Sequence, residues 1–263
     1  MIHKLANVHP NAQIGKNVTI EAFATVDENV IIGDNCRIDT NAVIRPGARL
    51  GNNVRIFSGA VISEIPQDLK FQGEETTVEI GDNTMIREFV TINRGTAAKN
   101  KTVIGKNCLL MTYAHVAHDC VIGDNVILVN SSQIAGEVEI DDFAILGGST
   151  LVHQFCKIGK HAMTQGGIKV SKDIPPYVKA AREPVSYTGV NSIGLRRRGF
   201  TNEQIDYIRD IYRIIFTQGL NYKSAIQIVK EKFEDTPEKT LILDFFKNSS
   251  RGIIPGMRSL NSK

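Results

Sequence analysis

The sequence predicts a mainly β fold, a parallel β-helix of hexapeptide repeats followed by a small α-helical carboxyl-terminal domain. Two observations predict it. A six-residue pattern recurs from residue 14 to about residue 170, with a branched aliphatic residue first, Asn or Gly often fourth and a small residue fifth. From about residue 201 the apolar residues instead recur at the spacing of helices.

Each position of the repeat has a physical reason. A branched aliphatic side chain every six residues fits a short strand that buries one side chain in a core. Asn or Gly at the fourth position fits a residue with positive φ, which other side chains rarely adopt. Three strands and three corners close a coil of eighteen residues, and coils stack at the strand-pairing distance of about 4.8 Å. We therefore expect a triangular rod.

Two segments break the repeat. Residues 63–77 and 93–103 lack the pattern, and loops that leave a regular scaffold often carry function. From Pro175 a segment punctuated by Pro and Gly leads out of the rod. We expect a β-helix domain over residues 1–190 and a helical domain over residues 191–263.

Three helices are expected in the second domain. The first opens with a capping box at residues 201–204 (TNEQ) and can end at Gly219. A second amphipathic stretch covers residues 222–233. A third begins after Thr236, with Pro237 in its first turn, where proline is favoured.

The composition excludes several classes of protein. The net charge of +3 is too small to indicate a nucleic-acid-binding protein. No apolar stretch is long enough to span a membrane, and the amino terminus lacks the apolar run of a signal peptide, so we expect a cytoplasmic protein. All the cysteines fall on the small fifth position of the repeat, where we expect buried, reduced thiols: Cys36, Cys108, Cys120 and Cys156.

Residues able to do chemistry gather in the middle of the repeat, in the segment 110–120 (LMTYAHVAHDC). His118 stands beside Asp119, and His115 lies three residues earlier. A histidine outside the core and next to a carboxylate suits general-base work, because its pKa is ordinarily near 6.5. Two alternatives stay open. One is a solvated turn histidine, and the other is a metal site, although no third ligand shares the column.

The eighteen-residue coil predicts which residues lie above His118. Gly136 and Gln154 follow at intervals of eighteen and are expected in the same column on the next two coils, with His153 beside Gln154. A histidine, a glycine with an accessible backbone and an amide would then project from one edge of the rod. We expect a substrate site along this edge, with His118 as its base.

The main basic cluster is Arg196 to Arg198, preceded by Lys169, Lys172, Lys179 and Arg182. Two interpretations stay open. One is a solvated face, and the other is capture of phosphates and of an acidic protein surface.

Eight segments together carry a family resemblance: QDLKF (67–71), NRGT (93–96), HVAHDC (115–120), DDFAILGG (141–148), HQFC (153–156), DIPPYV (173–178), GVNSIGLRRRGF (189–200) and SSRGI (249–253). Over nearly the whole chain, they closely resemble the UDP-N-acetylglucosamine O-acyltransferases. These enzymes move a 3-hydroxyacyl group from acyl carrier protein to the 3-hydroxyl of the sugar, the first step of lipid A synthesis. The resemblance implies left-handed β-helices, a cytoplasmic homotrimer with active sites between subunits, and no cofactor or metal.

Matched by position, the resemblance also implies roles for single residues. His118 would be the general base, Asp119 its orienting partner, and Gly136 the donor of a backbone N–H to the oxyanion. No Ser or Cys nucleophile is needed, because the hydroxyl of the substrate attacks. The residues implied to bind the substrates are Asp68, Lys70, His115, His153 and Gln154, with Asn191 and Arg198 toward the nucleotide and Arg197 toward the carrier protein.

The resemblance further implies that Gly166 sets the acyl length. With no side chain there, the acyl groove would stay open and accept a long 3-hydroxyacyl chain, of myristoyl length or more. The alternative is that Gly166 merely serves a turn, since Gly-rich corners are common in this repeat.

The chain departs from the family pattern at three positions, which bear on nucleotide and donor contacts. Glu137 stands where the family has histidine, and Asn93 stands where the family often has histidine. Ile193 stands where a glutamate is expected. Other functions stay open: another hexapeptide acyltransferase such as the N-acyltransferase of the same pathway, a metal-dependent hexapeptide lyase, or a non-catalytic scaffold. The N-acyltransferase would be expected to have a separate amino-terminal uridine-binding domain, whereas the repeat here starts almost at residue 8.

Overall fold

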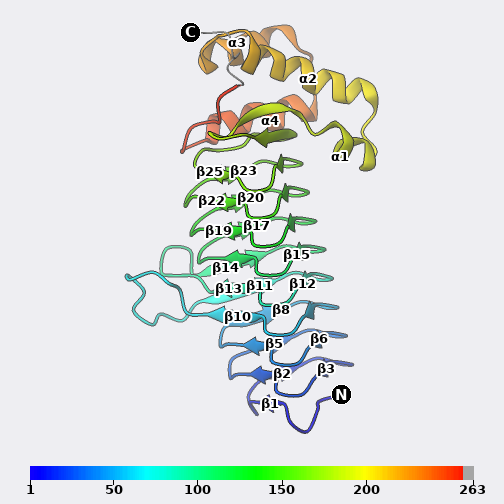
Figure 1. Ribbon diagram of the computed structural model, residues 1–263, viewed down its shortest axis with the longest axis vertical. Helices are drawn as coiled ribbons and strands as arrows, with labels where there is room; N and C mark the ends of the chain where they lie inside the picture. Colours follow the sequence, from blue (N-terminus) through cyan, green and yellow to red (C-terminus); the bar gives the residue numbers. More distant parts are fainter. Residues whose placement is uncertain (257–263) are drawn as a thin grey trace.

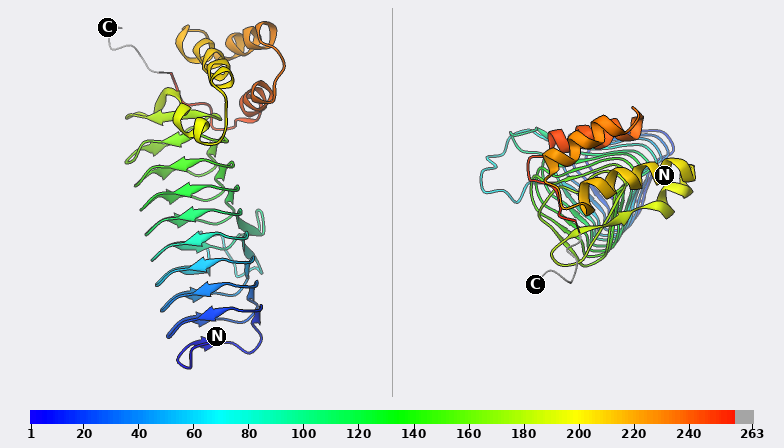
Figure 2. Two further views of the ribbon diagram at one scale, coloured as in Figure 1. Left: turned by 90° about the vertical axis from the view of Figure 1, so that its right-hand side faces the viewer. Right: turned by 90° about the horizontal axis from the view of Figure 1, so that it is seen from above.

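The computed structural model describes residues 1–256, which form a long rod of stacked coils with helices at its carboxyl-terminal end (Figure 1). Seen along its axis, the rod has three sides, each built from one parallel sheet (Figure 2). The rod is a left-handed parallel β-helix, which confirms the predicted fold class.

The strands are short, and each coil contributes one strand to each side. The first sheet contains β1 (Asn7–Val8), β4 (Thr25–Val26), β7 (Val43–Ile44), β10 (Val61–Glu64), β13 (Thr91–Asn93), β16 (His115–Val116), β19 (Gln133–Ile134), β22 (Leu151–Val152) and β25 (Lys169–Val170). The second contains β2 (Gln13–Ile14), β5 (Ile31–Ile32), β8 (Ala48–Leu50), β11 (Thr77–Ile80), β14 (Lys101–Ile104), β17 (Val121–Ile122), β20 (Glu139–Ile140) and β23 (Lys157–Ile158).

The third sheet contains β3 (Thr19–Ile20), β6 (Arg37–Ile38), β9 (Arg55–Ile56), β12 (Met85–Ile86), β15 (Leu109–Leu110), β18 (Ile127–Leu128), β21 (Ile145–Leu146), β24 (Met163–Thr164), β26 (Val178–Ala181) and β27 (Ser186–Val190). Where no loop intervenes, paired strands are eighteen residues apart, as in Leu109 opposite Ile127. The last pair, β26 and β27, is antiparallel and closes this sheet.

The core and the corners follow the positions of the repeat. The aliphatic residue of each coil side points inward, as in Ile20, Ile38 and Ile56, which are completely buried. The predicted positive φ at the fourth position is confirmed, for example 58° at Asn35. The four cysteines are free and buried, as predicted. Burial raises the pKa of the Cys120 thiol to about 12, so this thiol stays protonated at neutral pH.

The three edges of the rod differ, and we name each by what it carries. The loop edge joins the first sheet to the second, and its corners include residues 117–120, 135–138 and 153–156. The helix edge joins the second sheet to the third and carries Phe143 and His161, which contact Arg198 and Phe200 just after the first helix, α1 (Ser192–Arg197). The aromatic edge joins the third sheet to the first and carries Phe23, Phe89 and Tyr113.

Both interruptions of the repeat leave the rod at the loop edge. One loop connects β10 to β11 and the other connects β13 to β14, and both project from the same side of the rod (Figure 1). They are shorter than the predicted 63–77 and 93–103, because strands β10, β11, β13 and β14 extend into those ranges. The loops span residues 65–76 and 94–100.

The helices are α1 (Ser192–Arg197), α2 (Asn202–Thr217), α3 (Tyr222–Lys232) and α4 (Pro237–Asn248). The predicted capping box is present, with Thr201 and Gln204 bonded reciprocally. Gly219 has a φ of 70° just after α2, as expected at a helix end. Helix α1 was not predicted, because six residues are too few to show a helical period. Among residues 1–256, no helix is long and apolar enough to cross a membrane.

The chain returns to the rod after α4. Residue Ile253 forms a parallel bridge with Asp173, and Ile254 N donates to the Asp173 carbonyl at 3.0 Å. The last seven residues of the expected helical domain, 257–263, lie outside the described part of the chain. A division of the chain between residues 190 and 191 stays a prediction.

Candidate active site

His118 and Asp119 form a hydrogen-bonded pair on the loop edge. Nδ1 of His118 lies 2.8 Å from Oδ2 of Asp119. The Asp119 side chain is completely buried, while that of His118 keeps 18% of its surface exposed. An ionised carboxylate only accepts hydrogen bonds, so in the neutral form of the ring Nδ1 carries the proton and Nε2 keeps its lone pair. This is the tautomer that a general base requires.

The second loop holds the Asp119 carboxylate from the other side. Oδ1 accepts hydrogen bonds from Thr96 N at 3.0 Å and Lys99 N at 3.2 Å. Oδ2 accepts from Thr96 Oγ1 at 2.7 Å in addition to His118. Four donors on one carboxylate fix it in place. Thr96 belongs to the NRGT motif, but the sequence did not predict that it would hold Asp119.

The first loop brings Asp68 to the other nitrogen of the ring. Oδ2 of Asp68 lies 4.0 Å from Nε2 of His118, which leaves the nitrogen lone pair free of a direct hydrogen bond. Lys70 is an exposed residue of the same loop, and its backbone N–H donates to Oδ1 of Asp68 at 3.0 Å. The structure therefore places Asp68 beside His118 and Lys70 nearby on the loop.

Gly136 lies directly above the imidazole ring. A β-carbon built there would meet Cε1 and Nε2 of His118 at 2.6 Å each. The Gly136 N–H donates to no acceptor within residues 1–256. The His118 ring and a free backbone donor therefore lie at neighbouring positions, as the eighteen-residue spacing predicted.

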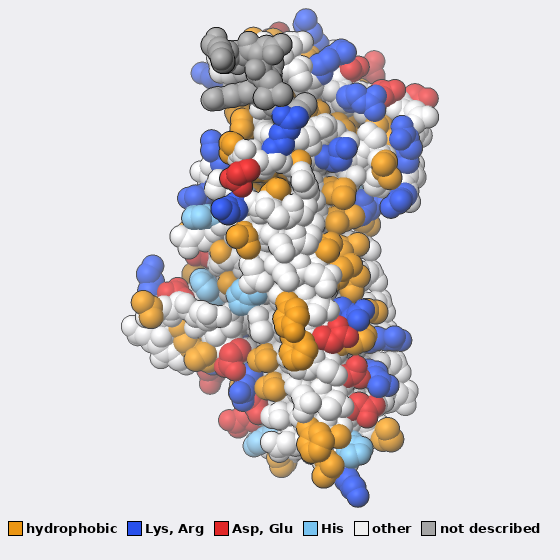
Figure 3. Space-filling view, viewed as in Figure 1, with side chains coloured by type: hydrophobic (Ala, Val, Ile, Leu, Met, Phe, Trp, Pro, Cys, Tyr) orange, Lys and Arg blue, Asp and Glu red, His pale blue; other side chains and the backbone are white. Residues whose placement is uncertain are grey.

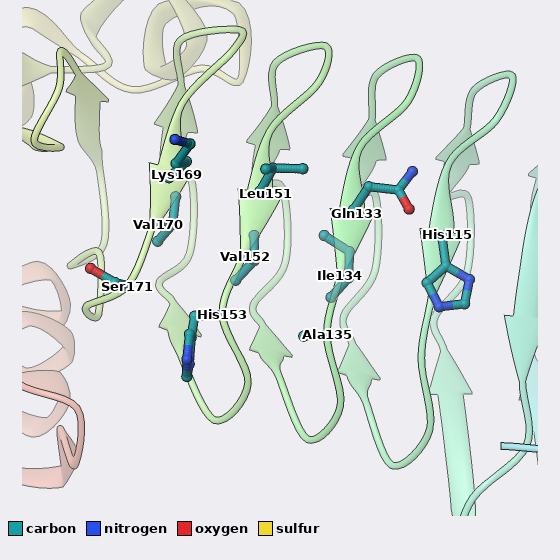
Figure 4. A pocket seen from close by; sticks show the side chains of 10 residues that line it. All are labelled: His115, Gln133, Ile134, Ala135, Leu151, Val152, His153, Lys169, Val170 and Ser171. Atoms are coloured by element: carbon teal, nitrogen blue, oxygen red, sulfur yellow. The ribbon is translucent and has the colours of Figure 1, made fainter. Parts of the chain in front are cut away.

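A groove runs over the outer face of the first sheet beside this edge. Its volume is about 490 Å³, and the residues that line it are His115, Gln133, Ile134, Ala135, Leu151, Val152, His153, Lys169, Val170 and Ser171 (Figure 4). His115 lies at one end of the groove, and its Nδ1 lies 2.7 Å from Thr91 Oγ1. Burial lowers the pKa of His115, so this ring is neutral at pH 7. Gln154 is an exposed residue of the loop edge, next to His153.

Three of the expected substrate residues lie elsewhere on this chain. Arg198 stacks over the Phe143 ring on the helix edge, 5.2 Å from its centroid, and Arg197 is exposed on α1. Asn191 is buried as the N-cap of α1, where its amide accepts from Gly194 N and donates to the His161 carbonyl. In a triangular rod the helix edge is the one farthest from the first sheet, so one chain does not bring these residues to His118.

The basic residues likewise do not form one cluster. Lys169 lines the groove on the first sheet, whereas Arg196 and Arg197 end α1 at the helix edge and Arg198 is its C-cap. Lys and Arg side chains are also frequent over the helical end of the rod (Figure 3).

The three departures from the family pattern have different surroundings. Asn93 is buried and holds the first loop through a hydrogen bond from Nδ2 to the Ile65 carbonyl at 2.9 Å. Glu137 occupies a left-handed corner with φ of 60°. Ile193 is 65% exposed on α1. Asn93 supports the site through its side chain, and Glu137 does so through its backbone N–H, which donates to the His118 carbonyl at 3.0 Å.

Comparison with protein families and curated proteins agrees with this architecture. A family model described as UDP N-acetylglucosamine O-acyltransferase, domain 2, matches residues 173–254, and a model of bacterial transferase hexapeptides matches residues 29–64 and 101–136. An acyl-[acyl-carrier-protein]–UDP-N-acetylglucosamine O-acyltransferase from Neisseria meningitidis is 48% identical over 97% of this chain and 99% of its own. The chain belongs to the UDP-N-acetylglucosamine O-acyltransferase family.

Solved structures of this family share the whole fold. A UDP-N-acetylglucosamine acyltransferase from Bacteroides fragilis superposes with a TM-score of 0.95 at 56% identity, over 97% of this chain and all of the other. The enzyme from Francisella novicida gives a TM-score of 0.94 at 40% identity, over 99% of this chain and 95% of the other. The family likeness therefore includes both the rod and the helical end.

Proposed function

We propose that this protein transfers a long 3-hydroxyacyl chain from acyl carrier protein to the 3-hydroxyl of UDP-N-acetylglucosamine, the first step of lipid A biosynthesis. The observation that carries the proposal is the His118–Asp119 pair, whose free Nε2 faces the space beside Gly136 at the margin of a groove. Relatives that match nearly the whole chain are named acyl-[acyl-carrier-protein]–UDP-N-acetylglucosamine O-acyltransferases.

The reaction follows from the arrangement of donors and acceptors. Nε2 of His118 removes the proton of the sugar hydroxyl as its oxygen attacks the thioester carbonyl, and Asp119 stabilises the imidazolium that forms. The Gly136 N–H donates to the developing oxyanion. When the tetrahedral intermediate collapses, the C–S bond breaks and His118 returns the proton to the departing sulfur. Positioned general-base catalysis contributes about 10²- to 10⁴-fold, and an oxyanion donor a similar factor.

No group beyond these is required for the chemistry. The nucleophile is the hydroxyl of the acceptor and the leaving group is the thiolate of the donor, so no cofactor and no protein nucleophile enters the balance. Asp68, at 4.0 Å from Nε2, can accept a hydrogen bond from another hydroxyl of the sugar and so orient it. His115, His153 and Gln154 extend the same surface toward the rest of the substrates.

We also propose that the active protein is a homotrimer. Asn191, Arg197 and Arg198 lie on the helix edge, so they can reach the nucleotide and the carrier protein only from a neighbouring copy. The aromatic edge offers a surface for such contact, since Phe23, Phe89 and Tyr113 are each more than half exposed. Figure 3 shows hydrophobic side chains gathered along the length of one face. A cytoplasmic location is part of the same proposal.

The test uses purified protein, UDP-N-acetylglucosamine and a series of 3-hydroxyacyl carrier proteins of increasing chain length, with the product identified by mass spectrometry. We expect an O-acylated nucleotide sugar, made fastest with long donors and by a species of trimeric mass in analytical ultracentrifugation. Absence of product with every donor would overturn the proposed reaction. Full activity in a monomer would overturn the shared site.

A further inference from the structure

A guanidinium from the far end of the chain contacts one of the groove histidines. Nη2 of Arg251 lies 3.3 Å from Nδ1 of His153, although the two residues are 98 positions apart. His153 lines the groove of the first sheet, and Arg251 belongs to the segment that returns to the rod after α4. None of the roles assigned above uses Arg251.

The returning segment is held firmly by Asp173, whose side chain is completely buried. Oδ2 of Asp173 accepts from Ser249 Oγ at 2.6 Å, and its backbone N–H donates to the Gly252 carbonyl at 2.8 Å. Oδ1 accepts from Lys157 N in the rod at 2.8 Å. Because these bonds flank Arg251 on both sides, its backbone position against His153 is fixed by the fold.

Two contacts compete for Nδ1 of the His153 ring. Nδ1 lies 3.3 Å from the Arg251 guanidinium but also 3.1 Å from the Gln154 carbonyl. A guanidinium only donates hydrogen bonds and a carbonyl only accepts them, so the two contacts require opposite states of Nδ1. When Arg251 donates to it, Nδ1 is the acceptor and the proton lies on Nε2. Without it, Nδ1–H can donate to Gln154 and Nε2 becomes an acceptor.

We propose that Arg251 is a positioning residue of the acyl-transfer site, which holds His153 in the tautomer that carries its proton on Nε2. The groove then presents an N–H donor to an acceptor oxygen of the nucleotide sugar. This inference rests on the proposed function for its substrate, while the contact itself can be tested on the free protein.

The first measurement needs no substrate. In ¹⁵N NMR of protein labelled in its histidine rings, with His153 assigned by comparison with His153→Gln, we expect the proton on Nε2. In Arg251→Met, which keeps the length of the side chain but removes its donors, we expect the proton on Nδ1. Arg251→Lys keeps a cationic donor and should restore the Nε2–H form. Arg37→Met, which removes an exposed arginine that pairs with Glu21 and Asp39 in an early coil, is the matched control and should change nothing.

The second measurement is kinetic. We expect Arg251→Met to raise KM for UDP-N-acetylglucosamine about tenfold, the effect of one lost hydrogen bond, with kcat nearly unchanged. Arg251→Lys should recover most of the loss. A purely structural role would instead lower the melting temperature and kcat together.

Three results would overturn the inference: a proton on Nδ1 in the unchanged protein, the same tautomer and the same KM in Arg251→Met, or a loss of stability and kcat that Arg251→Lys does not rescue. If the unchanged protein transfers no acyl group, the proposed function fails instead. The NMR comparison then still decides whether Arg251 sets the His153 tautomer.

Discussion

The backbone of Gly136 lies against the imidazole of His118 so closely that a β-carbon would be 2.6 Å from Nε2. Real β-carbons do not approach a heavy atom to this distance, so any side chain at residue 136 must displace the ring. The φ of Gly136 is not in the left-handed region, which means that glycine is needed here for space and not for backbone freedom. The stacking of coils thus ties the position of the His118 ring to a residue one coil above it.

Gly136→Ala should therefore impair catalysis more than folding. The new methyl group pushes the His118 ring away from its bond with Asp119, and a displacement of about 1 Å can cost about 10²-fold in rate. We expect a fall of this order in kcat with a change of only a few degrees in melting temperature. A variant with full kcat would show that the ring adapts without loss.

Asp119→Asn should approach the effect of His118→Ala. Since one oxygen of Asp119 accepts from two backbone N–H groups, the amide nitrogen of the substituted side chain would take the side that faces His118. A donor at that place favours the ring form with its proton on Nε2, which cannot act as a base. We expect kcat to fall on the order of 10³- to 10⁴-fold in both variants. Steady-state kinetics with retained near-normal turnover in Asp119→Asn would reject tautomer control by Asp119.

The fold could be predicted from the sequence because its signals are local. An inward aliphatic residue and a corner residue with positive φ, such as Asn35, recur every six residues. This period alone predicts the coil, the stacking of the coils and the alignment of residues that are eighteen positions apart. The same arithmetic placed Gly136 above His118. Helix α1 was not predicted because it is shorter than two turns.

The contacts of the site that the sequence did not predict are made by chain segments that fold over the rod. Asp119 was predicted as a partner of His118, but the repeat pattern does not indicate that Thr96 and Lys99 donate hydrogen bonds to it. Arg251 reaches His153 only because the chain turns back after α4. Asn191 was expected at the nucleotide, and that role stays a prediction, but within this chain its amide is already bonded as a helix cap.

His161 should make the stability of the protein depend on pH. Its ring is buried on the helix edge, stacked between Phe143 and Tyr177 at centroid distances of 4.9 and 5.6 Å. Burial, with the nearby Arg198 cation, lowers the pKa of His161 to about 4. The unfolded chain therefore takes up this proton at higher pH than the folded one does.

Because the pKa of His161 is lower in the folded protein than in the unfolded chain, acid destabilises the fold. The contribution of His161 is fully present above about pH 6.5 and is lost as the pH falls toward 4, by up to about 3 kcal/mol. His161→Phe keeps an aromatic ring in the stack but cannot titrate. We expect urea unfolding at pH 7 and pH 4.5 to show a smaller difference in free energy for this variant. An unchanged difference would assign the acid sensitivity to other groups.

Gly166 is the residue predicted to set the length of the acyl chain. Gly166 lies on the aromatic edge, at the opposite margin of the first sheet from His118. The left-handed corner residue is its neighbour Gly167, with φ of 73°, so the backbone at Gly166 does not require glycine for the turn. A β-carbon at Gly166 would lie 3.0 Å from the Gly148 carbonyl oxygen, which is tight but tolerable after a small shift.

Gly166→Met should consequently shorten the preferred donor without abolishing transfer. If the side chain closes the end of the acyl groove, each excluded methylene forfeits about 0.8 kcal/mol of burial, so preference should move to chains several carbons shorter. Gly166→Ala is the matched control, because it adds the same contact with Gly148 but too little volume to close a groove. We expect the alanine variant to keep the original chain-length profile in competition assays with mixed acyl donors. An equal loss for every donor in both variants would instead mean that Gly166 serves the packing of the corner, and that acyl length is set elsewhere.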